Sequence, residues 1–418
     1  MKRVLFSLVL VVVLISIAIA GCTTAAPAPA PTPTPSPTPA PAKTLDIGIA
    51  VPLTGPAAHL GTHIQNAILL AIDDQNNEGG VTIAGQKYML NSVIRDTKFD
   101  TMIGKTVAEE LVFDKGVKVI AGPFVADAIG AQSVTEPNKV ILFGTTASIP
   151  GICAPDKPYS FFPGGFAMMA LVNGAAYIQK FYPEAKTVVS MNPDLPDSIL
   201  WLDSVQKVIC PRYGLDWLGA EQYGMDTQDF MPMISRALAK KPDILDTSST
   251  GGTMGGMCCL LIKQLRESGY NGIIWSPTVP PPGVMEEVVP EKYRVRIVTN
   301  DIVVDSPIVS QVYRDMYKRY MDKFGAIPID IVGEIYNGVK PFFQFLDGQN
   351  TMDTTAWMEG FANYRWQGMF GHEGYWVGKP IFGINRILFR NFWVSEYIDG
   401  KLETNWEAPI PVDLFVGE

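Results

Sequence analysis

The sequence predicts an α/β protein of two lobes, each built on a parallel sheet flanked by helices. Short apolar runs with the period of strands alternate with segments that carry the apolar stripe of a helix. Turns rich in glycine and proline separate these segments. The 418 residues are 47% apolar, so the chain can bury a large core and is long enough to divide into two lobes.

The first repeating unit lies in residues 44–80. Alternating apolar residues at 45–51 predict a buried strand, and the prolines and glycine of 52–56 force a turn after it. Apolar positions at helical spacing follow in 64–72, and Gly79-Gly80 supplies a left-handed stop. Because the loop lies beside the amino end of a helix, we expect its surroundings to favour an anion.

The same pattern continues through the rest of the first lobe. Parallel strands joined by helices are connected by right-handed crossovers, and ligands of such sheets bind outside the carboxyl ends of the strands. Three loops are expected at that edge, in residues 52–61, 122–126 and 144–148. The predicted strands are 88–95, 117–121 and 140–143, and the predicted helices run from Asp100 to Gly116 and over 127–136.

A second series of strands and helices begins after the Pro/Gly-rich residues 159–165. Its predicted strands are 187–191, 215–219, 242–245 and 273–275; its helices cover 166–181, a segment ending near Cys210, a segment opened by Asp226, and 257–267. Two further helices, 309–324 and 334–346, follow without a strand between them, and strand-like runs at 387–389 and 392–394 close the chain.

We interpret the order of these elements as two lobes joined by three crossings of the chain. The two late helices are expected to return to the first lobe and the tail to complete the second. The predicted crossings lie near 159–165, 299–304 and 369–380; the first lobe is assigned 44–163 and 301–368, and the second lobe 164–300 and 369–418.

The amino terminus has the layout of an export signal and a tether. Residues 1–21 combine a short cationic start with an apolar run closed by small residues, which is typical of a secretory signal peptide. Cys22 follows in a sequence that resembles the bacterial lipobox, which predicts lipid attachment there and a place on the outer face of the cell membrane. The proline-rich residues 22–43 favour extended polyproline II and could span roughly 60 Å.

Charge and motifs exclude several classes of function. The net charge is −9, and without residues 1–21 the chain has 42 acidic against 31 basic residues, so nucleic acid is not an expected partner. No catalytic motif and no metal-ligand spacing of the three histidines is present, so neither an enzyme nor a cofactor or metal is expected. Cys258-Cys259 is interpreted as buried thiols; pairing of Cys153 with Cys210 is an alternative that would hamper hinge motion.

At this point the sequence resembles the type I periplasmic binding proteins that serve branched-chain amino acid transporters. The resemblance covers nearly all of residues 44–400. It is carried by the order and spacing of Ile47-Gly48, Pro52-Leu53-Thr54-Gly55, Gly79-Gly80, Gly122-Pro123 and the Asp226, Asp229-Phe230, Pro242-Asp243 series. The family implies two lobes that close on a small solute, as a monomer, and deliver it to an ABC-type permease.

The resemblance also implies where the solute binds. Hydroxyl and backbone groups of Thr146, Ala147 and Ser148 occupy the places that hold a solute's carboxylate and amino ends. Val125 stands where serine is usual, Leu60 where an aromatic is common, and Ser276-Pro277 where an acid is expected after Trp275. The candidate ligand-binding residues are therefore Leu60, Phe124, Val125, Thr145, Thr146, Ala147, Ser148, Asn192, Asp194, Asp197, Ser249, Thr250, Ser276 and Thr278.

Several of these residues have a simpler interpretation. Threonine, serine and glycine at strand ends are often only turn residues, and Asp197 could simply cap the following helix. Because an ammonium beside Trp275 would go unpaired, a small organic acid, with an apolar or aromatic body, is expected in preference to leucine or valine. The alternative is that Asp194 or Asp197 takes the place of the missing acid. Two functions stay open, a solute-binding lipoprotein of an importer and a sensor of the same fold that signals to a membrane partner.

Overall fold

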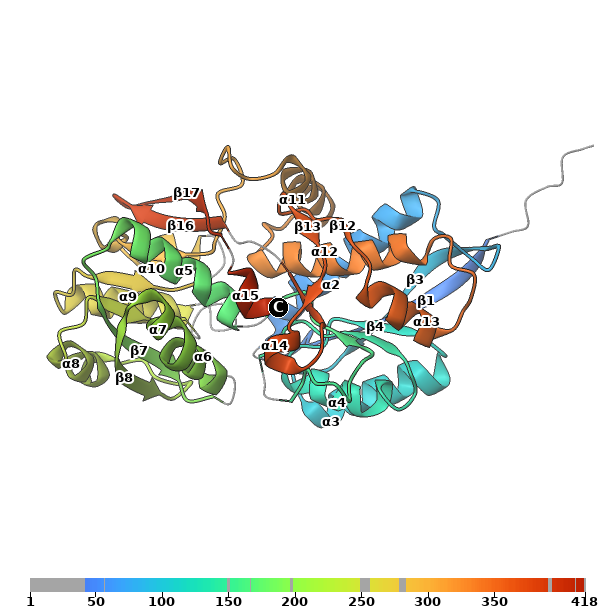
Figure 1. The fold of residues 1–418 in the computed structure, drawn as a ribbon, viewed down its shortest axis with the longest axis horizontal. Coiled ribbons are helices and arrows are strands. Elements are labelled where there is room, and N and C mark those ends of the chain that lie inside the picture. The colour runs from blue at the N-terminus through green and yellow to red at the C-terminus, as the bar shows by residue number, and fades with distance from the viewer. Residues whose placement is uncertain are drawn as a thin grey trace, which may run out of the picture. The chain divides into compact units, whose positions relative to one another are not determined.

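The computed structural model describes residues 42–55, 57–148, 151–165, 167–195, 198–248, 256–277, 283–389, 393–409 and 411–416 (Figure 1). The predicted signal peptide, Cys22 and all but the last residues of the linker lie outside these residues. The predicted α/β class is confirmed, because the described residues form two mostly parallel sheets with helices on both faces. No helix among them is long and apolar enough to span a bilayer.

The first sheet has the strand order β2-β3-β1-β4-β5-β6. Strand β1 lies inside it and pairs in parallel with β3 along its whole length and with β4. Only β2, which forms a hairpin with β3, runs antiparallel. The strands are β1 (Lys43–Val51), β2 (Val81–Ile83), β3 (Gln86–Asp96), β4 (Val119–Ala121), β5 (Ile141–Phe143) and β6 (Ser160–Phe161).

The two faces of this sheet are covered by different helices because successive side chains of a strand point to opposite faces. Ile49 of β1 belongs to a cluster with α2 and α12, whereas its neighbour Ala50 packs with α3 and α4. The helices are α2 (Ala58–Asn77), α3 (Thr101–Glu109), continued by the π-helical turn Glu110–Asp114, α4 (Ala126–Thr135), α11 (Gln311–Phe324), α12 (Asp330–Leu346) and α13 (Thr354–Ala362).

The second sheet has the order β17-β16-β11-β10-β9-β7-β8, with β16 and β17 antiparallel to the rest. Val188 of β7 packs with α5 and α6, and Val189 packs with α8 and α9 on the opposite face. Its strands are β7 (Thr187–Pro193), β8 (Asp216–Tyr223), β9 (Ile244–Asp246), β10 (Ile273–Trp275), β11 (Ile297–Thr299), β16 (Trp393–Ile398) and β17 (Lys401–Glu407). Its helices are α5 (Ala167–Phe181), α6 (Ser198–Ser204), α7 (Cys210–Tyr213), α8 (Met231–Ala239), α9 (Gly256–Glu267) and α10 (Val284–Val288).

The structure corrects some predicted elements. Helix α8 begins at Met231 and not at Asp226, because the carboxylate of Asp229 accepts the Met231 N–H at 2.9 Å. Strands β2, β6, β11 and β17 are short or solvent-facing and had no clear apolar period in the sequence. The thiols of Cys258 and Cys259 are buried as predicted, and the described cysteines form no disulfide.

The segment before β16 packs largely in the apolar cluster of the first sheet. Trp376 of β14 (Trp376–Val377), paired with β15 (Ile387–Leu388), lies against Phe161 with ring centroids 4.8 Å apart, and Met369 and Leu388 join the same cluster. These contacts favour a third crossing of the chain between the lobes after Leu388, later than the predicted crossing at residues 369–380. The boundaries of the two lobes remain a proposal. The remaining short elements are β12 (Trp366–Gln367), β13 (Glu373–Gly374), α14 (Lys379–Phe382) and α15 (Val412–Phe415).

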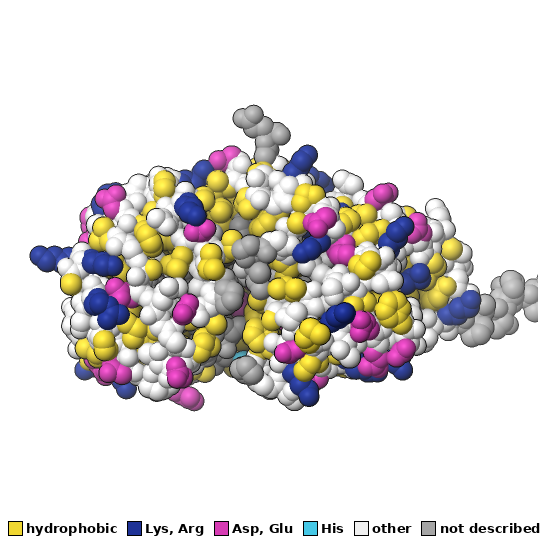
Figure 2. Space-filling model, turned by 90° about the horizontal axis from the view of Figure 1, so that it is seen from below, with side chains coloured by type: hydrophobic (Ala, Val, Ile, Leu, Met, Phe, Trp, Pro, Cys, Tyr) yellow, Lys and Arg dark blue, Asp and Glu magenta, His cyan; other side chains and the backbone are white. Residues whose placement is uncertain are grey.

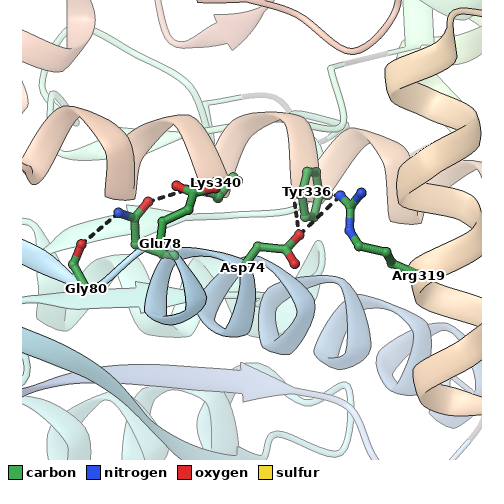
Figure 3. A network of polar contacts seen from close by, with 7 residues as sticks. Asp74, Glu78, Gly80, Arg319, Tyr336 and Lys340 are labelled. Atoms are coloured by element: carbon green, nitrogen blue, oxygen red, sulfur yellow. Dashed lines mark hydrogen bonds and ion pairs between the residues drawn. The ribbon is translucent and has the colours of Figure 1, made fainter.

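Helix α2 is joined to α12 and α11 by a network of polar contacts at its carboxyl end (Figure 3). The ammonium of Lys340, which is 5% exposed, donates to Gln75 Oε1 at 2.8 Å and to Glu78 Oε2 at 2.6 Å. One turn earlier, Asp74 accepts hydrogen bonds from Tyr336 and Arg319. Because Gln75 also donates to Gly80 O, the network fixes both the end of α2 and the start of β2.

Toward its amino end, α2 contacts α11 through a buried histidine. His63 is 6% exposed, and its Nδ1 lies 2.7 Å from the hydroxyl of Tyr320. Burial, with a smaller contribution from His59, lowers the pKa of His63 to about 4. The imidazole is therefore neutral in the folded protein at pH values where an unfolded chain would partly protonate it.

Removing the ammonium of Lys340 should destabilise the fold. In Lys340→Met the buried Gln75 oxygen loses its donor, and we expect a loss of about 1–3 kcal/mol in the free energy of unfolding, measured by urea denaturation. Lys323→Met is the control, because Lys323 of α11 pairs with Asp73 of α2 at a half-exposed site. This variant should lose less than about 1 kcal/mol in the free energy of unfolding. Equal losses in the two variants would contradict a structural role for the buried network.

His63 should make stability depend on pH. A lowered histidine pKa means that the unfolded chain binds more protons between about pH 6.5 and 4, so stability falls as the pH falls through this range. The loss from wild type between pH 7 and 5 should exceed that from His63→Gln by up to about 2 kcal/mol. His59→Gln, at an exposed position of the same helix, should follow wild type; parallel curves for wild type and His63→Gln would contradict the assignment.

Candidate functional site

Parallel pairing brings the carboxyl ends of β1, β4 and β5 to one edge of the first sheet. The three loops predicted there, 52–61, 122–126 and 144–148, are consequently neighbours. The chain segment after β6 joins them, because Gly164 N–H donates to Thr145 O at 2.8 Å. This edge is the candidate solute site of the first lobe.

The loop of residues 144–148 is held by its own hydrogen bonds. Thr145 is fully buried, and its hydroxyl donates to Gly122 O at 3.1 Å. The N–H of the buried Ala147 donates to Gly165 O at 2.9 Å, so neither residue has its polar group free for a solute. Ser148 Oγ donates to Thr146 Oγ1 at 2.9 Å, which leaves the proton of the half-buried Thr146 hydroxyl for another acceptor.

The loop after β1 is already bonded to a carboxylate of the protein. Asp96 accepts from Leu53 N–H at 2.8 Å and from the Thr54 hydroxyl at 2.6 Å. Burial alone would raise the pKa of Asp96, but these hydrogen bonds and one from Lys98 N–H lower it overall. Asp96 therefore occupies the Leu53 N–H and the Thr54 hydroxyl of this loop.

The loop after β4 contains a second carboxylate, Asp127. It accepts from Phe124 N–H at 3.1 Å and from Thr97 Oγ1 at 2.5 Å, yet burial raises its pKa to about 7. Val125 between them has φ 52° and ψ −93°, a strained conformation for a β-branched residue. Leu60 and Val125 are buried and Phe124 is half-buried, and Leu60 and Phe124 pack in the apolar cluster of the first sheet.

The second lobe presents mainly neutral groups at the carboxyl ends of its strands. Asn192 and Ser276 are fully buried, whereas Asp194 is exposed. Asp246, which the sequence analysis did not select, ends β9 and accepts from Ser190 Oγ at 2.7 Å and from Ser248 N–H at 2.9 Å; its burial raises its pKa. Of the predicted site residues, Asp197, Ser249, Thr250 and Thr278 lie outside the described residues.

A third carboxylate missed by the sequence analysis lies at the first-lobe edge. Glu334 of α12 is 4% exposed, and its Oε2 lies 2.9 Å from the point where a Cβ on Gly164 would stand. The methyl group of Thr146 lies 3.0 Å from the same point. Nothing in the sequence marks a single glutamate inside an amphipathic helix as part of a site formed some 170 residues earlier in the chain.

Other cavities lie away from this edge. A cavity of about 450 Å³ is lined by Lys241, Asp243, Tyr270 and Arg296, which precede or flank the amino ends of the second-sheet strands. No group of three or more possible metal ligands occurs in the part of the chain that the structure describes. On the face shown in Figure 2, acidic and basic side chains are interspersed and form no continuous basic patch.

Comparison with known proteins identifies the family. The model of the periplasmic binding protein family matches residues 44–382. A Leu/Ile/Val-binding protein of Rhizobium johnstonii, BraC3, is 32% identical over 109 residues, which are 26% of this chain and 28% of the relative. A leucine-, isoleucine-, valine-, threonine- and alanine-binding protein of Pseudomonas aeruginosa is 33% identical over 56% of this chain and 60% of its own length. Both matches thus span less than two thirds of the relative's length.

Solved structures share the fold over nearly their whole length. The substrate-binding protein LivJ of Streptococcus pneumoniae, in complex with isoleucine, has a TM-score of 0.69 at 18% identity, covering 86% of this chain and 98% of LivJ. A solute-binding protein from Rhodopseudomonas palustris BisB5, in complex with 3,4-dihydroxybenzoic acid, has a TM-score of 0.68 at 21% identity and covers 87% and 98%. The chain belongs to the periplasmic binding protein family.

Proposed function

We propose that this protein is the solute-binding component of an ABC-type importer and binds a small organic solute between its two lobes. The observation that carries the proposal is the family match over residues 44–382, together with two sheets whose strand ends both present polar loops. A cleft between lobes is a favoured ligand site, and closure around the solute would present a defined surface to a membrane permease.

The solute class is inferred from the first-lobe edge and from the relatives. The Thr146 hydroxyl can donate to a carboxylate, and Leu60, Phe124 and Val125 of the neighbouring loops are apolar. The solutes in the two similar structures, isoleucine and 3,4-dihydroxybenzoic acid, both combine a carboxylate with an apolar or aromatic body. We therefore assign this chain a solute of the same kind, an amino acid or an aromatic or aliphatic carboxylic acid.

The tether places this activity outside the cell membrane. The signal-like residues 1–21, Cys22 and the proline-rich residues 22–43 fit a lipid-anchored protein whose folded part is held away from the bilayer. Such an anchor keeps a solute-binding protein within reach of a permease in the same membrane.

Solute binding should close the two lobes. Small-angle scattering of the folded part, with isoleucine, benzoate and 3,4-dihydroxybenzoate added separately at saturating concentration, should show a smaller radius of gyration for the compound that binds. Calorimetry on the same samples identifies that compound. Calorimetric binding with an unchanged radius of gyration would contradict closure, and absence of binding to all three would contradict the solute class.

Membrane attachment should depend on Cys22. In the Cys22→Ser variant of the full chain we expect the protein to leave the membrane fraction, because no acyl chain can then be attached at this residue. Fractionation with mass spectrometry of the mature amino terminus measures both attachment and processing. A variant that stays membrane-bound and correctly processed would refute lipidation, whereas Cys153→Ser, at a buried thiol, should fractionate like wild type.

A further inference from the structure

We propose that the cavity between α13 and residues 383–386 binds a small oxyanion, phosphate or a carboxylate, at a site separate from the solute site. The cavity has a volume of about 350 Å³. The charged side chains that line it are two cations, Arg386 and Lys379, against one acid, Glu359, in a chain whose net charge is −9. None of these residues belongs to the strand-end loops, so the inference goes beyond the proposed function.

The first argument is that Arg386 is a buried cation whose hydrogen bonds go only to neutral acceptors. It is 6% exposed. Among the described residues its guanidinium donates from Nε to Pro158 O at 2.6 Å, from Nη1 to Asn385 O at 2.7 Å and from Nη2 to Met358 Sδ at 3.0 Å. A buried charge without a partner of opposite sign is costly, so an anion that reaches this guanidinium is stabilised there.

The nearby carboxylate of Glu136 offsets this cost only in part. Burial lowers the pKa of Arg386 to about 10, and the opposing effects of Cys153 and Glu136 are smaller. The Glu136 carboxylate is itself used, since it accepts from Ser160 Oγ at 2.6 Å and from Tyr159 N–H at 3.2 Å. The charge of Arg386 is therefore incompletely compensated within the protein.

The second argument is that N–H donors remain at the wall of the cavity. A guanidinium has five N–H groups, and the acceptors Pro158 O, Asn385 O and Met358 Sδ use three of them. One N–H is left on Nη1 and one on Nη2. Because Asn385 and Met358 both line the cavity, both Nη atoms lie at its wall. Two N–H groups of one guanidinium can hold two oxygens of the same oxyanion.

The third argument is that neighbouring residues add donors of the same kind. The backbone N–H of Lys379 donates to Asn385 Oδ1 at 2.9 Å, so the oxygen of this amide is used and its nitrogen keeps two N–H groups. The side chain of Lys379 is exposed and lines the same cavity, so its ammonium can approach an anion from the solvent side. An oxyanion thus finds a buried cation, an amide donor and a solvated cation together.

This site lies away from the solute-binding loop. Arg386 bonds to Pro158, which precedes β6, whereas Gly164 follows β6 and bonds to Thr145 of the solute-binding loop. Arg386 also accepts from Phe162 N–H at 2.8 Å through its backbone oxygen. A bound oxyanion would therefore strengthen the attachment of residues 383–386 to α13 and to β6, and should stabilise the fold.

Titration with simple anions tests the inference. Calorimetry and thermal unfolding compare sodium phosphate and sodium acetate with sodium chloride at the same ionic strength. We expect phosphate or acetate to bind in a one-to-one ratio and to raise the melting temperature above that in chloride, and the anion that binds more tightly identifies the class. Equal behaviour in all three salts would overturn the inference.

Two exposed positions locate the site, because their substitutions should act in opposite directions. Lys379→Met should weaken binding of the anion by about two- to fivefold, and Glu359→Gln should tighten it by a similar factor, because each removes one charge from the cavity. The matched controls are Lys401→Met and Glu403→Gln on exposed positions of β17, which should leave the affinity unchanged. Affinities that do not move in opposite directions at 379 and 359 would overturn the site.

Arg386→Gln should weaken binding by about tenfold or more, since two charge-assisted hydrogen bonds are lost. Should this buried substitution prevent folding, the opposite shifts at Lys379 and Glu359 decide the question. Thr146→Val, at the solute-binding loop, should bind phosphate or acetate like wild type. Loss of anion binding in this last variant would place the anion at the solute site and overturn the inference.

Discussion

The close packing of α12 against the chain segment after β6 is the constraint on which the rest of the structure depends. Gly338 and Gly164 allow this approach, because a side chain at either position would collide with Pro163 or with Thr145 O. The same helix is bound to α2 through Lys340, so one element joins the segment 163–165 to the first βα unit. The geometry of the loop 144–148 is consequently set in part by a helix that comes much later in the sequence.

This packing also decides the electrostatics of the candidate site. At the first two loops the N–H groups of Leu53 and Phe124 donate to Asp96 and Asp127. The Thr146 hydroxyl keeps a proton that it can donate, because it accepts a hydrogen bond from Ser148. The methyl group of Thr146 and the carboxylate of Glu334 both lie beside Gly164.

The sequence analysis recovered what depends on local pattern. Strand β1, helix α2 and the alternation of strands and helices follow from apolar periodicity, which is a property of neighbouring residues. The first residue of α8 was placed too early because two aspartates, Asp226 and Asp229, are equally plausible caps in sequence, and only one lies at the helix start. Strands such as β6 and β11 are three residues or fewer and are defined by their neighbours in the sheet.

The sequence by itself determined the α/β class, the two series of strands and the set of strand-end loops, because each follows from residue period and turn residues. Only the tertiary structure decided which polar groups of those loops remain available. Thr145 and Ala147 are used within the lobe, and the carboxylate of Glu334, from a distant helix, lies against Gly164. The physical reason is that hydrogen-bond satisfaction and charge depend on which atoms meet in space, and residues far apart in the chain meet only after packing.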